Sequence, residues 1–265
     1  GFDIAGAVLS LLAVGGLVLA VQEGPEQGWT ATITIIGFVI GIAAVVGFVV
    51  VELRREHPLL DVRLFRNEGL TTGSVNLFVV FALMFAIFLI LVQFLQAVLG
   101  YTALHAATAL LPMAVMMMPL STVAPTIAHK IGYRRTVVTG MLTLAAGLAL
   151  LALLADADRG YLSILPGLLL IGAGVGLAMS PSTTAITSSL TEDKQGVASA
   201  LNDTVREIGA AMGLALIGSI LSSQFRTNIT DLANTYPPET ATRIKQGIGG
   251  ALSTAAQLGP DGQPL

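Results

Sequence analysis

Cysteine is absent from the sequence, and charge is scarce. None of the 265 residues is cysteine, and only 11% are charged. Without cysteine the chain can form no disulfide, no thiolate metal site and no cysteine nucleophile. Soluble domains carry about 25% charged residues, so a chain with this few would leave too much apolar surface facing water. The net charge of −3 offers no basic surface for nucleic acid,.

Sequence signatures of enzymes are also missing. The three histidines, His57, His105 and His129, lie far apart, and none belongs to an H-E-x-x-H motif. No Walker A sequence is present, and the glycines at 172, 174 and 176 do not have G-x-G-x-x-G spacing,. We therefore expect no enzyme activity, no nucleotide or metal site and no cofactor.

Long apolar runs dominate the rest of the chain, of which 54% is hydrophobic. A helix needs about 20 mostly apolar residues to cross a hydrocarbon core of about 30 Å. The runs are continuous rather than alternating, which excludes barrel strands. The sequence thus predicts an all-α, polytopic transmembrane helix bundle in the lipid bilayer. Its seven predicted spans are 4–21, 31–51, 70–95, 103–127, 137–155, 161–188 and 197–222.

Lysine and arginine set the expected orientation. Eight basic residues lie in three loops on one side, which span 52–68, 128–135 and 191–196. The short loops on the other side hold only Arg159. The positive-inside rule makes the basic side cytoplasmic. We expect a multi-pass protein of the plasma (inner) membrane, with its amino end inside and its carboxyl tail outside.

Three charged residues, Asp203, Arg206 and Glu207, lie inside the last predicted span. Asp203 and Glu207 are four residues apart, so they share one helix face, and Arg206 is their neighbour. Carboxylates in a low-dielectric cavity can bind and release protons near neutral pH. Alternatively, residues 208–225 cross the membrane alone, over about 27 Å, and the three charges form a structural ion-pair group at the cytoplasmic mouth.

Uncharged polar groups and small residues give weaker signals. Asn76, Gln93 and Gln96 in the third span are candidate contacts in a substrate cavity, although hydrogen bonding between helices is the commoner role of such residues. Glycine pairs four residues apart allow close helix approach. These pairs are Gly37 with Gly41, Gly172 with Gly176, and Gly209 with Gly213. In the tail, residues 241–258 form either an interfacial helix or a solvated loop.

Four stretches in a fixed order carry a resemblance to a known family. They are the turn at Gly28 and Trp29, the connector 52–66, the segment 93–100 followed by Leu111 and Pro112, and the pair of segments 172–181 and 196–209. In this order the sequence resembles the carboxyl-terminal portion of the fourteen-helix drug:proton antiporters of the major facilitator superfamily.

The resemblance implies a partial major facilitator fold, with the seven spans as helices seven to thirteen of fourteen. Residues 1–51 would be the central helix pair, 52–69 a cytoplasmic connector, 70–222 five helices of the second six-helix bundle, and 223–265 an extracytoplasmic tail or loop. The amino-terminal six-helix bundle of the same protein, and the last helix, would be missing.

The resemblance also implies a basic cytoplasmic gate loop between two spans. His129, Lys130, Gly132, Arg134 and Arg135 match it, although His129 stands where the family often has an acidic residue. Such a loop can cap helix ends and pair with carboxylates.

The function we expect is proton-driven export of small hydrophobic or cationic compounds. Asp203 and Glu207 are the candidates for protonation or cation attraction, with Arg206 tuning them. Two alternatives remain from the sequence: a major facilitator carrier of another solute, such as a sugar, peptide or lipid precursor, and a non-transporting membrane scaffold.

Overall fold

The chain is helical throughout the residues that the computed structural model describes, which are 4–55, 62–245 and 247–258. Seven helices in these ranges are long and apolar enough to cross a membrane, which confirms the predicted number of spans. Contacts divide the chain into two compact units. The first unit is Gly1–Leu11 with Ala44–Leu214, and the second unit is Leu12–Ala43 with Ala215–Leu265.

The helices follow the predicted spans, with shifted ends. The long helices are α1 (Ile4–Gln27), α2 (Thr32–Arg54), α3 (Glu68–Gln93), α5 (Leu111–Ile131), α6 (Tyr133–Leu154), α7 (Leu165–Ser188) and α8 (Gln195–Ala233), and the short ones are α4 (Ala103–Ala109), α9 (Pro238–Lys245) and α10 (Ile248–Leu258). Short 3-10 helices span Val62–Arg66, Gly160–Ser163 and Glu192–Lys194, and a π-helical turn, Phe94–Val98, follows α3. Of the predicted connector, residues 56–61 lie outside the described part of the chain.

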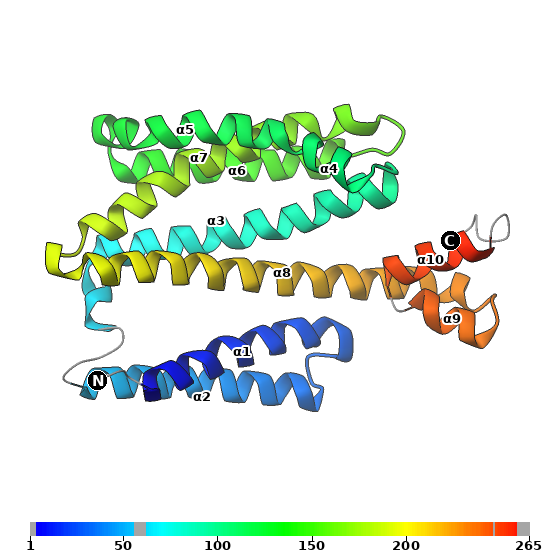
Figure 1. Cartoon of the computed structure of the whole chain (residues 1–265), viewed down its shortest axis with the longest axis horizontal. Coiled ribbons are helices and arrows are strands. Elements are labelled where there is room, and N and C mark those ends of the chain that lie inside the picture. The colour runs from blue at the N-terminus through cyan, green and yellow to red at the C-terminus, as the bar shows by residue number, and fades with distance from the viewer. Residues whose placement is uncertain (1–3, 56–61, 246, 259–265) are drawn as a thin grey trace. The chain divides into compact units, whose positions relative to one another are not determined.

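Helix α7 is the centre of the first unit. It packs against α3, α5 and α6, and Figure 1 shows it beside α5 and α6. Inside its membrane span 61% of the residues are buried, against 28% or less in every other span. The remaining helices therefore expose apolar faces, such as Leu142 and Leu153 of α6, which suit contact with lipid rather than water.

Glycines of α7 explain how its neighbours approach so closely. A Cβ at Gly172 would fall on the Met113 carbonyl of α5, and one at Gly176 would lie 2.6 Å from the Met117 carbonyl. On the opposite side, a Cβ at Gly174 would lie 2.5 Å from the backbone nitrogen of Leu144 in α6. No side chain larger than hydrogen fits these positions without moving a backbone.

The other two predicted glycine pairs also mark close helix contacts. In the first unit, Gly209 and Gly213 of α8 lie against the backbone of α3 at Phe78 and Ala82. In the second unit, a Cβ on Gly41 of α2 would lie 2.8 Å from the Leu17 nitrogen of α1. The glycine pattern thus correctly predicts where helices pack.

The fourth predicted span, 103–127, is broken in the structure. Helix α4 ends at Ala109, and α5 begins again at Leu111 with Pro112 in its first turn. Proline has no N–H to continue the helical ladder. The carbonyl of Ala109 at this break accepts a 2.7 Å hydrogen bond from the hydroxyl of Tyr161, which belongs to the Gly160–Ser163 turn. A side chain 52 residues away therefore satisfies a carbonyl at the break.

We expect Tyr161→Phe to destabilise the chain by about 1–2 kcal/mol near neutral pH, because the substitution leaves the buried Ala109 carbonyl without this donor. Burial, and then the neighbouring Tyr101, raises the pKa of Tyr161, which precedes the α7 span. A tyrosine with a raised folded-state pKa stabilises fully below its unfolded pKa of about 10 and loses this contribution as the pH rises through the folded value. The difference between the two proteins should therefore shrink above about pH 10.

Detergent-induced unfolding, monitored by helical circular dichroism across this pH range, measures the difference. Tyr101→Phe serves as the control, since it removes a phenolic hydroxyl from the same place without touching the Ala109 carbonyl. A gap between wild type and Tyr161→Phe that widens at alkaline pH would contradict the assigned bond.

The tail is more ordered than a solvated loop. Helix α8 continues eleven residues past the predicted end of the last span, to Ala233. In the second unit, Ala233, Ala241 and Ile244 are buried together, and Phe225 and Tyr236 pack against them. The described residues of 241–258 belong mainly to α9 and α10, so the helical alternative is the correct one, and its placement at a membrane interface stays a prediction.

Candidate functional site

The three charged residues of α8 line one pocket in the first unit. This pocket has a volume of about 420 Å³, and we term it the α3–α8 pocket. Asp203, Arg206, Glu207, Ala210, Ala211 and Leu214 form its α8 wall, and Phe81 and Phe85 form its α3 wall. The α8 residues recur at three- and four-residue intervals, which places them on one side of the helix. The sequence prediction that the charges share a face therefore agrees with the structure.

Arg206 is held by two other helices. Its Nη2 donates a 2.9 Å hydrogen bond to Thr183 Oγ1 of α7. Its guanidinium carbon lies 5.2 Å from the centre of the Phe81 ring on α3, within the range of a cation–π contact. The Nε atom is buried without a hydrogen-bond partner in the described part of the chain. The positive charge is thus fixed in place by Thr183 and Phe81.

The two carboxylates are not neutralised by this arginine. Among the described residues, no ion pair joins Arg206 to Asp203 or Glu207. Both acids are exposed on the pocket side of α8, and within the described part of the chain Asp203 Oδ1 accepts only a long, 3.4 Å hydrogen bond from Asn202 Nδ2. Unpaired carboxylates beside aromatic rings can attract a cation or accept a proton.

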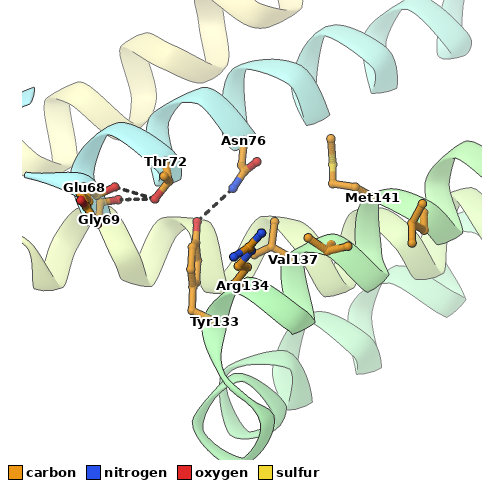
Figure 2. Close-up of a pocket in the computed structure, with 10 residues that line it drawn as sticks. Glu68, Gly69, Thr72, Asn76, Tyr133, Arg134, Val137 and Met141 are labelled. Carbon is orange, nitrogen blue, oxygen red and sulfur yellow. Dashed lines mark hydrogen bonds between the residues drawn. The ribbon is translucent and has the colours of Figure 1, made fainter.

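Asn76 belongs to a second pocket, on a different side of α3. This α3–α6 groove has a volume of about 550 Å³. Figure 2 shows Asn76 reaching across it to Tyr133, whose hydroxyl oxygen accepts a 3.1 Å hydrogen bond from Asn76 Nδ2. The lining residues are Glu68, Gly69, Thr72, Asn76, Tyr133, Arg134, Val137, Val138, Met141 and Leu142.

The structure does not bring the three predicted amide residues together. Gln93 is half-buried at the end of α3, and Gln96 is exposed in the π-helical turn that follows. Neither lines the α3–α8 pocket or the α3–α6 groove. Their role as substrate contacts, like that of Asn76, stays a prediction.

The predicted gate loop is almost entirely helical. Helix α5 continues to within one residue of α6, and only Gly132 separates them. This glycine has a φ of 96°, a conformation that a side chain would strain. His129 and Lys130 occupy the last turn of α5, while Arg134 and Arg135 occupy the first turn of α6. All four are exposed, and Arg134 alone among them lines the α3–α6 groove.

Three residues at this site were not predicted from the sequence: Phe81 and Phe85, which line the pocket, and Thr183, which holds Arg206. Phe81 and Phe85 are four residues apart on α3 and stack with ring centres 6.3 Å apart. Their spacing could have marked them as one face of a helix, but in a span rich in phenylalanine it carries little information. Thr183 had no distinguishing signal, because α7 contains several other hydroxyl residues.

Comparison with known proteins identifies the family. The profile of the Major Facilitator Superfamily matches residues 1–214. The multidrug resistance protein Stp of Mycobacterium tuberculosis is 33% identical over 222 residues, which cover 84% of this chain and 41% of Stp. The multidrug transporter protein MdtP of Bacillus subtilis is 28% identical over 260 residues, 97% of this chain and 48% of MdtP.

A third relative has the same extent of similarity. The multidrug efflux pump LfrA of Mycolicibacterium smegmatis is 30% identical over 257 residues, which cover 97% of this chain and 50% of LfrA. The chain thus spans about half the length of the curated relatives that it matches, or somewhat less. Seven membrane-spanning helices and a profile match over most of the chain agree, and the chain is a multi-pass membrane protein that belongs to the Major Facilitator Superfamily.

Proposed function

We propose that this chain forms part of a proton-driven exporter of hydrophobic or cationic compounds, and that the α3–α8 pocket lies on the transport path. The observation that carries the proposal is the pair of carboxylates, Asp203 and Glu207, which face the pocket without an ion pair to Arg206. Relatives named for multidrug resistance, transport and efflux support the class of substrate.

The pocket combines the two properties that such a substrate requires. Phe81 and Phe85 offer apolar surface and aromatic faces to a hydrophobic cation,. The carboxylates attract the positive charge when ionised and lose that attraction when protonated. Proton binding and cation binding therefore compete for the same groups, which is the elementary requirement for exchanging one for the other.

Arg206 has a separate role in this proposal. Because Thr183 and Phe81 hold its guanidinium, the arginine remains near the carboxylates without neutralising either one. Both acids therefore remain available to a cation that enters the pocket.

The remaining parts of the proposal concern the whole transporter. The amino end lies in the cytoplasm of a plasma-membrane protein, as the basic loops indicate. A further six-helix bundle of the same protein faces residues 70–222 across a central cavity that opens alternately to each side. In this arrangement a cytoplasmic gate is formed by His129, Lys130, Gly132, Arg134 and Arg135.

Uptake of a lipophilic cationic dye into inverted vesicles tests the proposed function. The vesicles contain the full-length transporter that includes this chain, and vesicles without it are the control. We expect an acidic vesicle interior to drive dye accumulation in exchange for protons that leave the vesicle, and a protonophore to return accumulation to the control level.

The outcomes separate the three interpretations of the sequence. Dye uptake that is indifferent to the protonophore would refute proton coupling. Transport of a sugar, peptide or lipid precursor, in the absence of dye uptake, would make the protein a carrier of another solute. No transport of any tested solute would favour a membrane scaffold.

A further inference from the structure

A proline near the end of α1 leaves one backbone carbonyl of that helix without its usual donor. Helix α1 continues to Gln27, and Pro25 is the third residue from this end. Proline has no N–H, so it cannot donate to the carbonyl four residues earlier, which is that of Val21. Val21 lies inside the first membrane span. An unpaired carbonyl there costs free energy unless a side chain of a neighbouring helix supplies a donor.

Ser219 of α8 supplies that donor. Its hydroxyl oxygen lies 3.2 Å from the carbonyl oxygen of Val21, and the hydroxyl also donates to the carbonyl of Gln22. A hydroxyl has one hydrogen, so the two carbonyls share it. All three residues belong to the second unit, and Ser219 is only 2% exposed. Because the bond joins two segments of this chain, it does not depend on what covers the outer surface of the helices.

Helices α1 and α2 form a tightly packed pair in the second unit. A Cβ on Gly16 of α1 would lie 2.7 Å from the backbone nitrogen of Gly41 in α2. At the turn between the helices, the Trp29 ring lies 2.6 Å from the position of a Cβ on Gly24. The same ring stacks with Phe38 of α2, with ring centres 6.4 Å apart. A contact that holds α1 therefore holds α2 as well.

The helix that provides Ser219 also carries the carboxylates of the proposed function. Helix α8 runs unbroken from Gln195 to Ala233 and includes Asp203, Glu207 and Ser219. Segments that are hydrogen-bonded to a helix and packed against it move with that helix unless the contact breaks. The bond made by Ser219 therefore bears on how the α1–α2 pair moves during transport.

We propose that Ser219 is a positioning residue that fastens the α1–α2 pair to α8 through the carbonyl left open by Pro25, and that the pair stays with α8 throughout the transport cycle. The fastening is a property of this chain alone, whereas the role in the cycle rests on the proposed function. The pair is accordingly part of the moving bundle and not a free linker between two bundles.

Hydrogen exchange of the full-length protein in detergent tests the fastening. Ser219→Thr keeps the hydroxyl, and Ser219→Val has nearly the same shape as threonine but lacks it. Mass spectrometry of peptides from the end of α1 measures how often this segment opens. One net hydrogen bond corresponds to about a three- to ten-fold change in the opening equilibrium. We expect the end of α1 to exchange faster by this factor in Ser219→Val than in Ser219→Thr.

Removing the proline provides the matched control. Pro25→Ala restores an N–H that can donate to the Val21 carbonyl within α1 itself. In this background the difference between Ser219→Val and Ser219→Thr should fall below about two-fold, because the two positions serve the same carbonyl. Gel filtration and helical circular dichroism identify any variant that fails to fold.

A reversible cross-link tests whether the pair stays with α8 during transport. Gln22→Cys is joined to Ser223→Cys, one turn beyond Ser219, by a bifunctional thiosulfonate reagent with a flexible spacer. This chain contains no cysteine, and cysteines elsewhere in the full-length transporter are replaced by serine. Leu221→Cys, about 200° around α8 from Ser219, is the control partner and should be joined less. Linked protein should keep dye uptake within about two-fold of unlinked protein, because groups that do not separate can be tied without loss.

Several results would overturn the proposal. Equal exchange in Ser219→Val and Ser219→Thr, or an unchanged difference in the Pro25→Ala background, would refute the fastening. Equal cross-linking of the two cysteine pairs would refute the predicted neighbours. A cross-link that blocks dye uptake until a reductant removes it would show that the pair leaves α8 during transport. Absence of dye uptake before cross-linking would refute the proposed function and the role in its cycle, whereas the exchange rates decide the fastening independently.

Discussion

Removing both carboxylates from the α3–α8 pocket is expected to lower dye uptake at least about ten-fold. A ten-fold loss corresponds to about 1.4 kcal/mol. One pair of unit charges about 4 Å apart interacts by about 1 kcal/mol in water and about 4 kcal/mol in a partly protein-lined site. The double variant Asp203→Asn/Glu207→Gln keeps the size and polarity of both side chains but cannot ionise or exchange a proton. Initial rates of gradient-driven uptake of the cationic dye measure the effect.

The matched control removes the same formal charge elsewhere. Asp231→Asn/Glu239→Gln replaces two exposed carboxylates at the end of α8 and the start of α9, in the second unit. This variant should retain dye uptake within about two-fold of wild type, because neither carboxylate lines the α3–α8 pocket and exposed charges are screened by salt,. If the Asp203/Glu207 double variant transports as well as the control, the pocket carboxylates have a structural role at the mouth of the helix bundle.

Gly172→Leu is expected to abolish correct packing of α7 against α5. Even the first carbon of the new side chain would fall on the Met113 carbonyl, which is backbone and cannot rotate away. Inserting side-chain atoms into a packed core costs about 1–3 kcal/mol, and more where backbones must separate. Because α7 also contacts α3 and α6, we expect a loss of about 3 kcal/mol or more, and little folded protein.

Gly15→Leu provides the comparison for this substitution. Gly15 lies inside α1, and apart from the neighbouring backbone of α1 itself no atom of the described chain lies within 4 Å of a Cβ placed there. The same residue change should therefore leave the yield of folded protein near wild type. Fluorescence-detected gel filtration of both variants measures the difference. Similar yields for Gly172→Leu and Gly15→Leu would show that α5 and α7 are further apart than their contact in this structure.

The sequence was sufficient for features encoded within single helices. Each membrane span shows as a continuous apolar run because the bilayer imposes one length and one polarity on every helix. The shared face of Asp203 and Glu207 follows from helical periodicity alone. Gly172 and Gly176 signalled a close contact because only small residues allow backbones to approach.

Features that depend on a partner helix were not predictable in this way. The partners of Arg206 are Thr183 and Phe81, which belong to two other helices, and periodicity does not state which helix faces which. Asn76 shares α3 with Phe81, but the two residues line different pockets. The break before α5 was missed for a similar reason, since Pro112 is tolerated both inside and at the start of a span.

The connector between α5 and α6 is a single residue, Gly132, so the ends of the two helices cannot move apart. The last residue of α5 and the first of α6 are separated only by Gly132, so their Cα atoms can lie no more than about 7.6 Å apart. Each of the two helices is stiff, and a connector of one residue cannot lengthen when either helix tilts. The two helices are therefore mechanically coupled. A tilt of the end of α5 must displace the first turn of α6, which contains Arg134.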